Sequence, residues 1–264
     1  MEKTAIIGRG MTSEIYSWEG DKVLKLFYQD FNREAAEYEA GICESLNGCG
    51  LDIPVYHGKK IIDGRMGLIY ERIDGENLLS VMINDFRNMR KYLKRIAAEQ
   101  DKINRIQINR RIISQKDRLK RMIGLSADRL GEYYPRIIRR LECMDDHTNL
   151  CHGDFHPGNV IVRDGKFVTI DWMNAYSGSR ISDAARTYLM FVSPFLPDEV
   201  PFLLKVIIRI SKPWIGRTFL NEYLKISGID RKELIEWLPI VASARLIENI
   251  PGEEKWLMGI IRNM

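Results

Sequence analysis

The chain has 264 residues, of which 45% are hydrophobic and 29% are charged. This composition is typical of a globular protein and excludes a largely disordered chain, and the length allows a sizeable core without disulfide bonds. The cysteines, at positions 43, 49, 143 and 151, form no CxxC pair, which argues against a disulfide scaffold and against a structural zinc site.

The sequence shows no segment with the character of a membrane span or a secretion signal. Among its most apolar stretches is Val200 to Ile210, which is short and includes Lys205 and Arg209, whereas a span requires about 20 apolar residues. The first residues lack the basic-then-apolar order of a signal peptide. We therefore expect a cytoplasmic protein with no membrane partner.

Positive charge is concentrated in residues 87–140, here called the basic block. The formal net charge of the chain is +4, but the block alone has 17 Lys and Arg against 5 Asp and Glu, an excess of 12. Such a block can attract nucleic acid, a membrane surface or an anionic small molecule. It can also be the solvated face of long helices, and charge alone leaves these alternatives open.

The first 74 residues predict a mainly antiparallel sheet with one helix. Asn32 is a suitable N-cap for a helix that reaches about Leu46. A glycine-rich turn begins at Gly8, and Asp63-Gly64 is a hairpin signal; tight turns between short strands favour antiparallel pairing. The expected strands cover residues 4–7, 15–18, 22–27, 55–62 and 66–72.

After Leu78 the pattern becomes mainly helical. Helical periodicity predicts helices at about 77–94, 96–109, 114–123 and 126–144. Ser126 is expected to cap the last of these. Short strands return at 149–162 and 166–172, and helices follow Ser182.

One segment of the chain carries a motif typical of phosphoryl transfer. Residues 152–159 read HGDFHPGN, and a second aspartate, Asp171, follows Asn159 by twelve residues at a strand end. In protein kinases, the aspartate of such a loop accepts the hydroxyl proton, and the asparagine and the later aspartate hold metal ions. The alternative is that these residue types simply favour turns.

These residues, with Ile-Asp-Trp at 170–172, resemble the aminoglycoside phosphotransferase and choline kinase family over roughly residues 7–188. Gly153 stands where protein kinases typically have arginine, which favours the small-molecule kinases. The resemblance implies an α+β, two-lobed, protein-kinase-like fold. It implies a nucleotide-binding lobe with an antiparallel sheet at 1–74 and a mainly helical catalytic and acceptor-binding lobe at 75–264.

The resemblance also implies a reaction: transfer of the γ-phosphate of ATP or GTP to a hydroxyl group of a small molecule. Asp154 is then the base that orients and deprotonates the acceptor hydroxyl. Asn159 and Asp171 supply the hard oxygen ligands that suit Mg²⁺. His152 is expected to be structural, whereas His156 either faces the acceptor or is a satisfied polar group.

Gly8, Gly10 and Ser13 form a G-x-G-x-x-S turn that would bring backbone N–H groups toward phosphate oxygens. Protein kinases have a third glycine at the position of Ser13, and the small-molecule kinases often have serine. A dinucleotide-binding turn is excluded because a strand follows. A Walker A loop is excluded because no Gly-Lys-Ser/Thr sequence follows.

Lys25 lies in an apolar strand, where a charge requires a partner or a ligand. The resemblance implies that Lys25 binds the α- and β-phosphates and pairs with a carboxylate of the next helix. Glu39 is the favoured partner, with Glu34 and Glu37 as the other candidates. A simple outward-facing lysine is the remaining alternative.

The strand from Leu68 ends at the break Asp74-Gly75 and resembles the hinge between lobes. Adenine would then bind main-chain groups near Glu71 and Ile73. Because recognition by main-chain groups leaves no side-chain signature, ATP and GTP stay open as donors. The stretch 178–186 resembles a family segment, with Asp183 expected to be structural and Ser179 replacing a common aspartate.

Two other functions compete with this interpretation. A protein kinase is disfavoured because nothing resembling an Ala-Pro-Glu segment follows Asp171. A nucleotide-binding or nucleic-acid-binding module would use the basic block, but the few aromatic residues there argue against a base-stacking surface. If the basic block lines the acceptor site, it favours an anionic acceptor over a cationic aminoglycoside.

Overall fold

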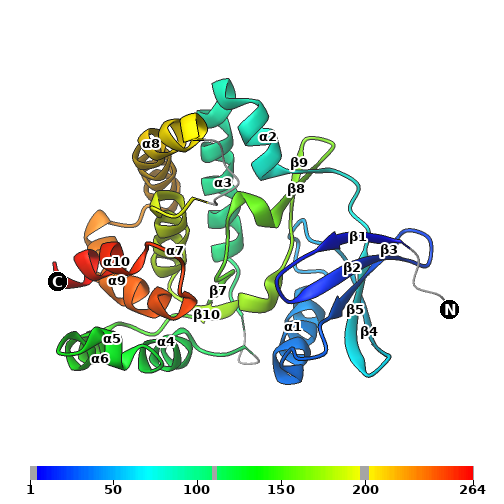
Figure 1. Cartoon of the computed structure of the whole chain (residues 1–264), viewed down its shortest axis with the longest axis horizontal. Helices are drawn as coiled ribbons and strands as arrows, with labels where there is room; N and C mark the ends of the chain where they lie inside the picture. The colour runs from blue at the N-terminus through cyan, green and yellow to red at the C-terminus, as the bar shows by residue number, and fades with distance from the viewer. Residues whose placement is uncertain (1–4, 109–111, 197–201, 264) are drawn as a thin grey trace. The chain divides into compact units, whose positions relative to one another are not determined.

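The computed structural model describes residues 5–108, 112–196 and 202–263, and the chain divides into two compact units (Figure 1). Unit 1 extends to Ile83 and also includes Pro157–Ala175. Unit 2 comprises Asn84–His156 and continues from Tyr176. Unit 1 is therefore built from two separate parts of the sequence, and the second part contains Asn159 and Asp171.

Unit 1 contains a five-stranded antiparallel sheet, as the sequence predicts, with the strand order β1-β2-β3-β5-β4. The strands are β1 (Ile6–Arg9), β2 (Ser13–Trp18), β3 (Lys22–Phe27), β4 (Tyr56–Ile62) and β5 (Arg65–Glu71). Gly8 lies inside β1 and opposite Ile15, not in the turn as expected. The turn itself is closed by the Gly10 N–H, which donates to the Ser13 carbonyl at 2.9 Å.

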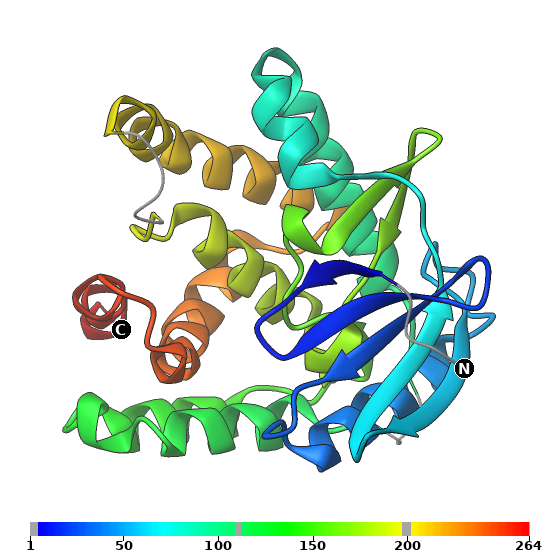
Figure 2. The same cartoon turned by 45° about the vertical axis from the view of Figure 1, so that its right-hand side comes forward.

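Helix α1 (Arg33–Leu46) lies beside this sheet and packs against β4 and β5 (Figure 2). The predicted cap is confirmed, because the Asn32 side chain accepts hydrogen bonds from the N–H groups of Glu34 and Ala35. A small antiparallel sheet completes the unit. It contains β6 (Glu76–Asn77), β8 (Val160–Arg163) and β9 (Lys166–Thr169), and helix α2 (Leu78–Asn84) follows β6.

Within unit 1, hydrogen bonds hold the segments that carry Asn159 and Asp171 to each other and to the first part of the unit. The Thr169 N–H donates to the Asp52 carbonyl at 2.9 Å, and the Ile170 N–H donates to the Asn159 carbonyl at 2.9 Å. The Tyr38 hydroxyl of α1 donates to the Ala175 carbonyl at 2.7 Å. These bonds place the end of β9 against the first part of the unit.

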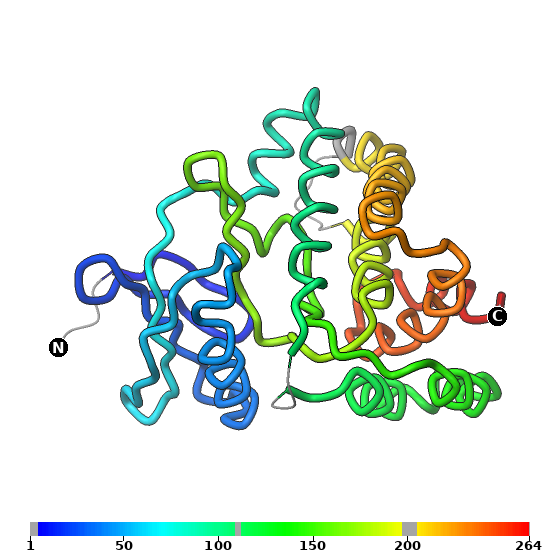
Figure 3. The backbone as a smooth tube through the Cα atoms, turned by 180° about the vertical axis from the view of Figure 1, so that it is seen from behind, coloured from blue at the N-terminus to red at the C-terminus, as the bar shows by residue number. Residues whose placement is uncertain are grey.

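Unit 2 is mainly helical. Its helices are α3 (Met89–Asn104), α4 (Gln115–Gly124), α5 (Ala127–Leu130), α6 (Tyr133–Cys143), α7 (Arg180–Val192), α8 (Phe202–Ser227), α9 (Arg231–Arg245) and α10 (Glu254–Arg262). Helix α3 lies alongside α8 (Figure 3), and α7 packs against α8 and α9. Strand β7 (Asn149–Cys151) pairs with β10 (Tyr176–Gly178). Among the described residues, none of these helices combines the length and apolar character of a membrane span.

Several predicted helix boundaries are wrong. Helix α3 is continuous across Lys94 and Ile96, because one buried face runs through it, and the break falls instead before Met89. The helix expected at 126–144 is divided at Gly131, whose φ of +51° ends α5. Ser126 does not cap that helix, since its buried hydroxyl has no hydrogen-bond partner. Helix α3 also ends at Asn104, earlier than predicted, and the expected end at Asn109 lies outside the described residues.

Candidate functional site

A buried ion cluster in unit 1 contains three of the predicted site residues. The Lys25 ammonium donates to both oxygens of Glu39, at 2.8 and 2.9 Å, and to Oδ1 of Asp171 at 2.9 Å. Glu39 is only 1% exposed and also accepts a hydrogen bond from the Tyr70 hydroxyl at 2.9 Å. Of the candidate glutamates, Glu39 is therefore the partner of Lys25.

The cluster places two carboxylates around one ammonium group. Burial opposes the charge on Lys25, but Glu39 and Asp171 outweigh this effect and raise the pKa of the lysine above its ordinary value. The lysine is thus held in its charged form. The Asp171 side chain is 39% exposed, so the cluster has an excess negative charge at a carboxylate that reaches solvent.

The backbone of Asp171 has an unusual conformation. Its φ of +64° lies in the left-handed region, which residues other than glycine occupy uncommonly, aspartate and asparagine more often than most. The hydrogen bond from Ile170 to Asn159 keeps the two predicted metal ligands on neighbouring segments. A carboxylate and an amide oxygen are donors that fit Mg²⁺, which takes its other ligands from water and from substrate phosphates.

The fold itself does not require glycine at Gly8 of β1 or at Gly10 of the turn that follows. A Cβ added at Gly8 would meet Ile15 at 3.7 Å, and one at Gly10 would meet the Ser13 carbonyl at 3.7 Å, which are ordinary contacts. Neither glycine has a positive φ. The folded chain alone would therefore accept alanine at either position, whereas Ser13 is buried at the start of β2.

The predicted hinge residues lie at the end of β5: Glu71 is its last residue, and Ile73 follows it. The Glu71 N–H donates to the Val55 carbonyl, and the Glu71 carboxylate accepts from Arg163 at 2.8 Å. Among the described residues, the main chain of Ile73 makes no hydrogen bond. Ile73 rather than Glu71 thus has main-chain groups available to a ligand.

The loop that carries Asp154 belongs to unit 2, and hydrogen bonds to the Asp183 side chain hold its main chain. This buried carboxylate accepts the N–H groups of His152 at 3.2 Å and Gly153 at 2.9 Å. Gln100 and Asn104 of α3 also donate to Asp183, both at 3.0 Å. The expected structural role of Asp183 is confirmed, and its partner is the loop itself.

His152 is fully buried and also supports the loop. Its Nδ1 accepts the Asp154 N–H at 3.3 Å, and its ring meets the edge of the Phe155 ring with centroids 5.8 Å apart. Gly153 has a φ of +75°, a conformation that favours glycine. These contacts agree with the structural role expected for His152.

Arg186 of α7 contacts Asp154, and the sequence motifs did not predict this. Its guanidinium donates to Asp154 Oδ1 at 3.1 Å, to the Gly153 carbonyl and to Glu248. Burial alone would raise the pKa of Asp154. The positive charge of Arg186 outweighs burial, with help from His156 and His152, and lowers the pKa below its ordinary value. The only signal in the sequence was the match of Arg186 to the family segment at 178–186.

The two units thus hold different parts of the predicted site. Unit 1 brings together Lys25, Glu39 and Asp171 and contains the glycine-rich turn and Asn159. Unit 2 holds Asp154 on a loop fixed by Asp183 and Arg186.

Comparisons with solved structures show which fold this is. A ternary complex of a thermostable mutant of aminoglycoside phosphotransferase APH(4)-Ia with AMP-PNP and hygromycin B has a TM-score of 0.67 at 14% identity, covering 98% of this chain and 91% of that one. The amicoumacin kinase hAmiN has a TM-score of 0.62 at 12% identity, with coverages of 99% and 87%. A putative fructosamine-3-kinase from Haemophilus somnus has a TM-score of 0.62 at 15% identity, with coverages of 98% and 90%.

Sequence comparisons give the family. No curated protein matches the sequence. The model of the phosphotransferase enzyme family matches residues 7–205, which is well over half of the chain and includes the Lys25 cluster and the whole 152–159 loop. The fold predicted from the motif, α+β with an antiparallel sheet followed by a helical part, agrees with these relatives. The chain therefore belongs to the phosphotransferase enzyme family and is a phosphotransferase.

Proposed function

We propose that this phosphotransferase moves the γ-phosphate of ATP to a hydroxyl group of a small molecule. The observation that carries the proposal is the buried Lys25–Glu39–Asp171 cluster in a member of this family. A lysine held in its charged form by a buried carboxylate is suited to contact nucleotide phosphates. The similar structures contain AMP-PNP with hygromycin B in one case and AMP-PNP with Ca²⁺ in another, which supports ATP as the donor.

Mg²⁺ fits the two oxygen donors of unit 1. Asn159 and Asp171 would hold the ion, which when bound neutralises charge on the phosphate oxygens. The excess negative charge of the Lys25 cluster supports this assignment, because Asp171 keeps an exposed carboxylate after pairing with Lys25.

The remaining nucleotide contacts follow from the local structure. The fold does not require glycine at Gly8 or Gly10. We therefore propose that glycine is present at both positions because it lets a nucleotide phosphate approach the main chain closely. The main-chain N–H and C=O groups of Ile73, two residues after Glu71, make no hydrogen bond among the described residues and could bond to the edge of a purine base. We propose that residues 1–74 form the nucleotide-binding lobe and residues 75–264 the catalytic and acceptor-binding lobe of a cytoplasmic enzyme, with GTP as an alternative donor.

Asp154 is the proposed base. Its lowered pKa keeps the carboxylate ionised at neutral pH, so it can accept a hydrogen bond from the acceptor hydroxyl and then its proton. A strong base is not needed, because the transition state of phosphoryl transfer is loose and depends mainly on positioning. Arg186 and Asp183 supply that positioning by holding the side chain and the main chain of the loop.

The proposal is tested by thermal unfolding with ATP or GTP, each with and without Mg²⁺. Nucleotide at a hundred times its dissociation constant should add about 2.7 kcal/mol of stability. We expect a Mg²⁺-dependent increase that Asp171→Asn removes, since asparagine tolerates the left-handed backbone but lacks the charge. Asp164→Asn is the matched control, because Asp164 is an exposed residue of unit 1 that also has a positive φ.

Two results would contradict the proposal. One is the absence of any stabilisation by either nucleotide with Mg²⁺. The other is an equal Mg²⁺-dependent increase in the wild type and in Asp171→Asn, which would place the metal elsewhere.

A further inference from the structure

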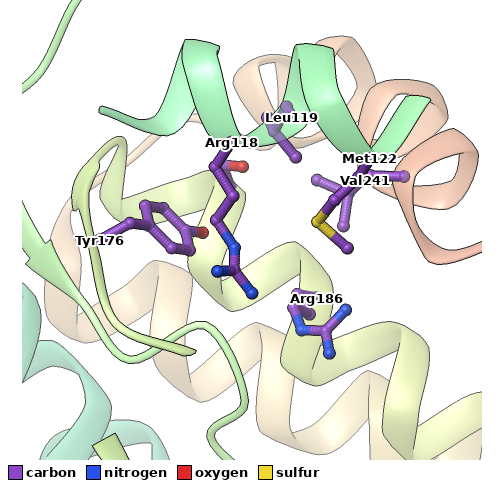
Figure 4. A pocket seen from close by; sticks show the side chains of 8 residues that line it. Arg118, Leu119, Met122, Tyr176, Arg186 and Val241 are labelled. Carbon is purple, nitrogen blue, oxygen red and sulfur yellow. The ribbon is translucent and has the colours of Figure 1, made fainter. Parts of the chain in front are cut away.

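In both units, the glutamate that pairs with the buried cation of the site is itself held by a further group. Arg186, in the wall of a small cavity of unit 2 (Figure 4), pairs with Glu248, and Arg245 contacts the other oxygen of that carboxylate at 3.1 Å. In unit 1 the glutamate is Glu39, and the group that holds it is the hydroxyl of Tyr70. A hydroxyl carries no charge, so Tyr70 holds Glu39 without neutralising it.

The Tyr70 hydroxyl connects strand β5 to helix α1 at the Glu39 carboxylate. It donates to Oε1 at 2.9 Å, and the same oxygen accepts a hydrogen bond from the Lys25 ammonium at 2.8 Å. Among the described residues, Lys25 and Tyr70 are the only hydrogen-bond donors to this carboxylate. Burial and the charge of Glu39 raise the pKa of Tyr70 well above its ordinary value, so the hydroxyl keeps its proton and remains a donor.

Two neighbours hold Tyr70 itself. Its ring packs against that of Tyr56, the residue opposite it in strand β4, with the centroids 5.6 Å apart. The sulfur of Cys43, on the same helix as Glu39, lies 3.5 Å from the Tyr70 hydroxyl oxygen. A carboxylate paired with an ammonium group only accepts hydrogen bonds, so Tyr70 gives its proton to Glu39. Burial raises the pKa of the Cys43 thiol to about 12, and this protonated thiol donates to the Tyr70 oxygen.

A tyrosine is suited to restrain Glu39 because its side chain is stiff. The Lys25–Glu39 pair joins two flexible side chains, and the lysine has a four-carbon stem. The ring of Tyr70 has only two side-chain torsions, and its packing against Tyr56 restricts them. Asp171, the other partner of Lys25, is the exposed carboxylate assigned to Mg²⁺. Glu39 is therefore the buried partner that continues to anchor Lys25 in the proposed complex.

We infer that Tyr70 is a positioning residue for nucleotide binding, because its hydroxyl fixes Glu39 and through it the Lys25 ammonium. The inference rests on the proposed function, since it takes Lys25 to contact the nucleotide phosphates. Tyr70 acts here only through Lys25. It should therefore affect the binding of a ligand that has phosphates and not that of a ligand with only the base and the sugar.

The test measures the dissociation constants of ATP, with Mg²⁺, by calorimetry and of adenosine by competition against ATP, both on the full chain. Tyr70→Phe removes the hydroxyl and keeps the ring, and it should weaken ATP binding about tenfold and leave adenosine binding unchanged. Tyr56→Phe is the matched control, because the Tyr56 hydroxyl is buried and has no hydrogen-bond partner among the described residues. It should leave the binding of both ligands unchanged.

A second measurement needs no nucleotide. The urea midpoint of unfolding is compared for the wild type, Tyr70→Phe, Glu39→Gln and the double variant. A hydrogen bond to an ionised acceptor is about twice as strong as one to a neutral acceptor. Tyr70→Phe should therefore lower the midpoint about half as much in the Glu39→Gln background as in the wild type.

Two results of the binding measurements overturn the inference. One is a Tyr70→Phe variant that binds ATP as tightly as Tyr56→Phe does. The other is an equal loss of affinity for ATP and for adenosine, which would assign Tyr70 to the pocket of the base.

The failure of the proposed function gives a different pattern. A wild type that binds neither ATP nor adenosine would contradict the proposed function, and the urea midpoints would then still show whether Tyr70 fixes the charged Glu39. Conversely, a wild type that binds Mg²⁺-ATP, with equal midpoint losses from Tyr70→Phe in the two backgrounds, would keep the proposed function and overturn the role of Tyr70.

Discussion

The charge clusters of the two units both pair basic side chains with carboxylates, a lysine in unit 1 and arginines in unit 2, but they differ in their balance. In unit 1, one ammonium group lies between two carboxylates, and the surplus charge is on the exposed Asp171. In unit 2, Arg186 is shared between Asp154 and Glu248, and Glu248 in turn contacts Arg245 at 3.1 Å. The first arrangement leaves one carboxylate partly exposed to solvent, whereas the second restrains a carboxylate.

The cluster of unit 2 also extends much further. Arg245 makes two hydrogen bonds to the buried Glu253, at 2.7 and 2.8 Å, and Glu253 accepts a hydrogen bond from Ser193. Alternating charges thus connect the loop of Asp154 with α9 and with the segment before α10. A carboxylate that must orient a hydroxyl benefits from such restraint, because transfer depends on positioning.

The largest expected effect comes from removing the proposed base. Asp154→Asn should lower the turnover of any acceptor that the wild type phosphorylates by roughly 10²- to 10⁴-fold, since proton acceptance is lost. Stabilisation by Mg²⁺-ATP should remain, because the nucleotide contacts are assigned to unit 1. Steady-state kinetics measure the turnover, and thermal shift measures the stabilisation by Mg²⁺-ATP. Turnover close to that of the wild type would remove Asp154 from the mechanism.

The next effect concerns stability. Arg186→Met leaves Asp154 and Glu248 without their shared buried partner and should reduce the free energy of unfolding by about 3–5 kcal/mol. Arg163→Met breaks the ion pair with Glu71, whose side chains are 40% and 29% exposed, and should cost about 0–1 kcal/mol. Urea denaturation measures both. Equal losses of unfolding free energy in the two variants would show that the buried cluster of unit 2 stabilises the fold no more than an exposed ion pair does.

A pH dependence follows from the lowered pKa of Asp154. A carboxyl group whose pKa is lower in the folded state stabilises the fold above its unfolded pKa, about 3.9, and loses this contribution as the pH falls through the folded value. The stability difference between the wild type and Asp154→Asn should therefore be largest near neutral pH and shrink below about pH 4. Urea denaturation of both proteins at several pH values measures this stability difference. A difference that grows on acidification would contradict the assigned role of Arg186.

The smallest expected effect is at the glycine-rich turn. Gly10→Ala should change the free energy of unfolding by less than about 0.5 kcal/mol, because the added Cβ has room, yet raise the Michaelis constant for ATP. Gly75→Ala is the contrast, since its Cβ would collide with the Val162 carbonyl oxygen and destabilise the fold. A wild-type Michaelis constant for ATP in Gly10→Ala would contradict the proposal that a nucleotide phosphate lies close to Gly10.

Local patterns in the sequence were enough to predict much of unit 1. Asn32 caps α1 through its own side chain, and hairpins between short strands produce the antiparallel sheet. Glu39 could also have been singled out by periodicity. It lies on the same face of α1 as Ala36, Ala40 and Cys43, all of which are buried. A charged residue on that face requires a partner such as Lys25.

The sequence by itself was enough to predict the chemistry, from the HGDFHPGN loop, the second aspartate and the charged lysine in an apolar strand. Tertiary structure decided which groups contact these residues. Arg186 reaches Asp154 across 32 residues of sequence, and Lys25 reaches Asp171 across 146. The physical reason is that motifs and helix caps depend on neighbours in the chain, whereas buried charges are paired only when packing brings distant segments together.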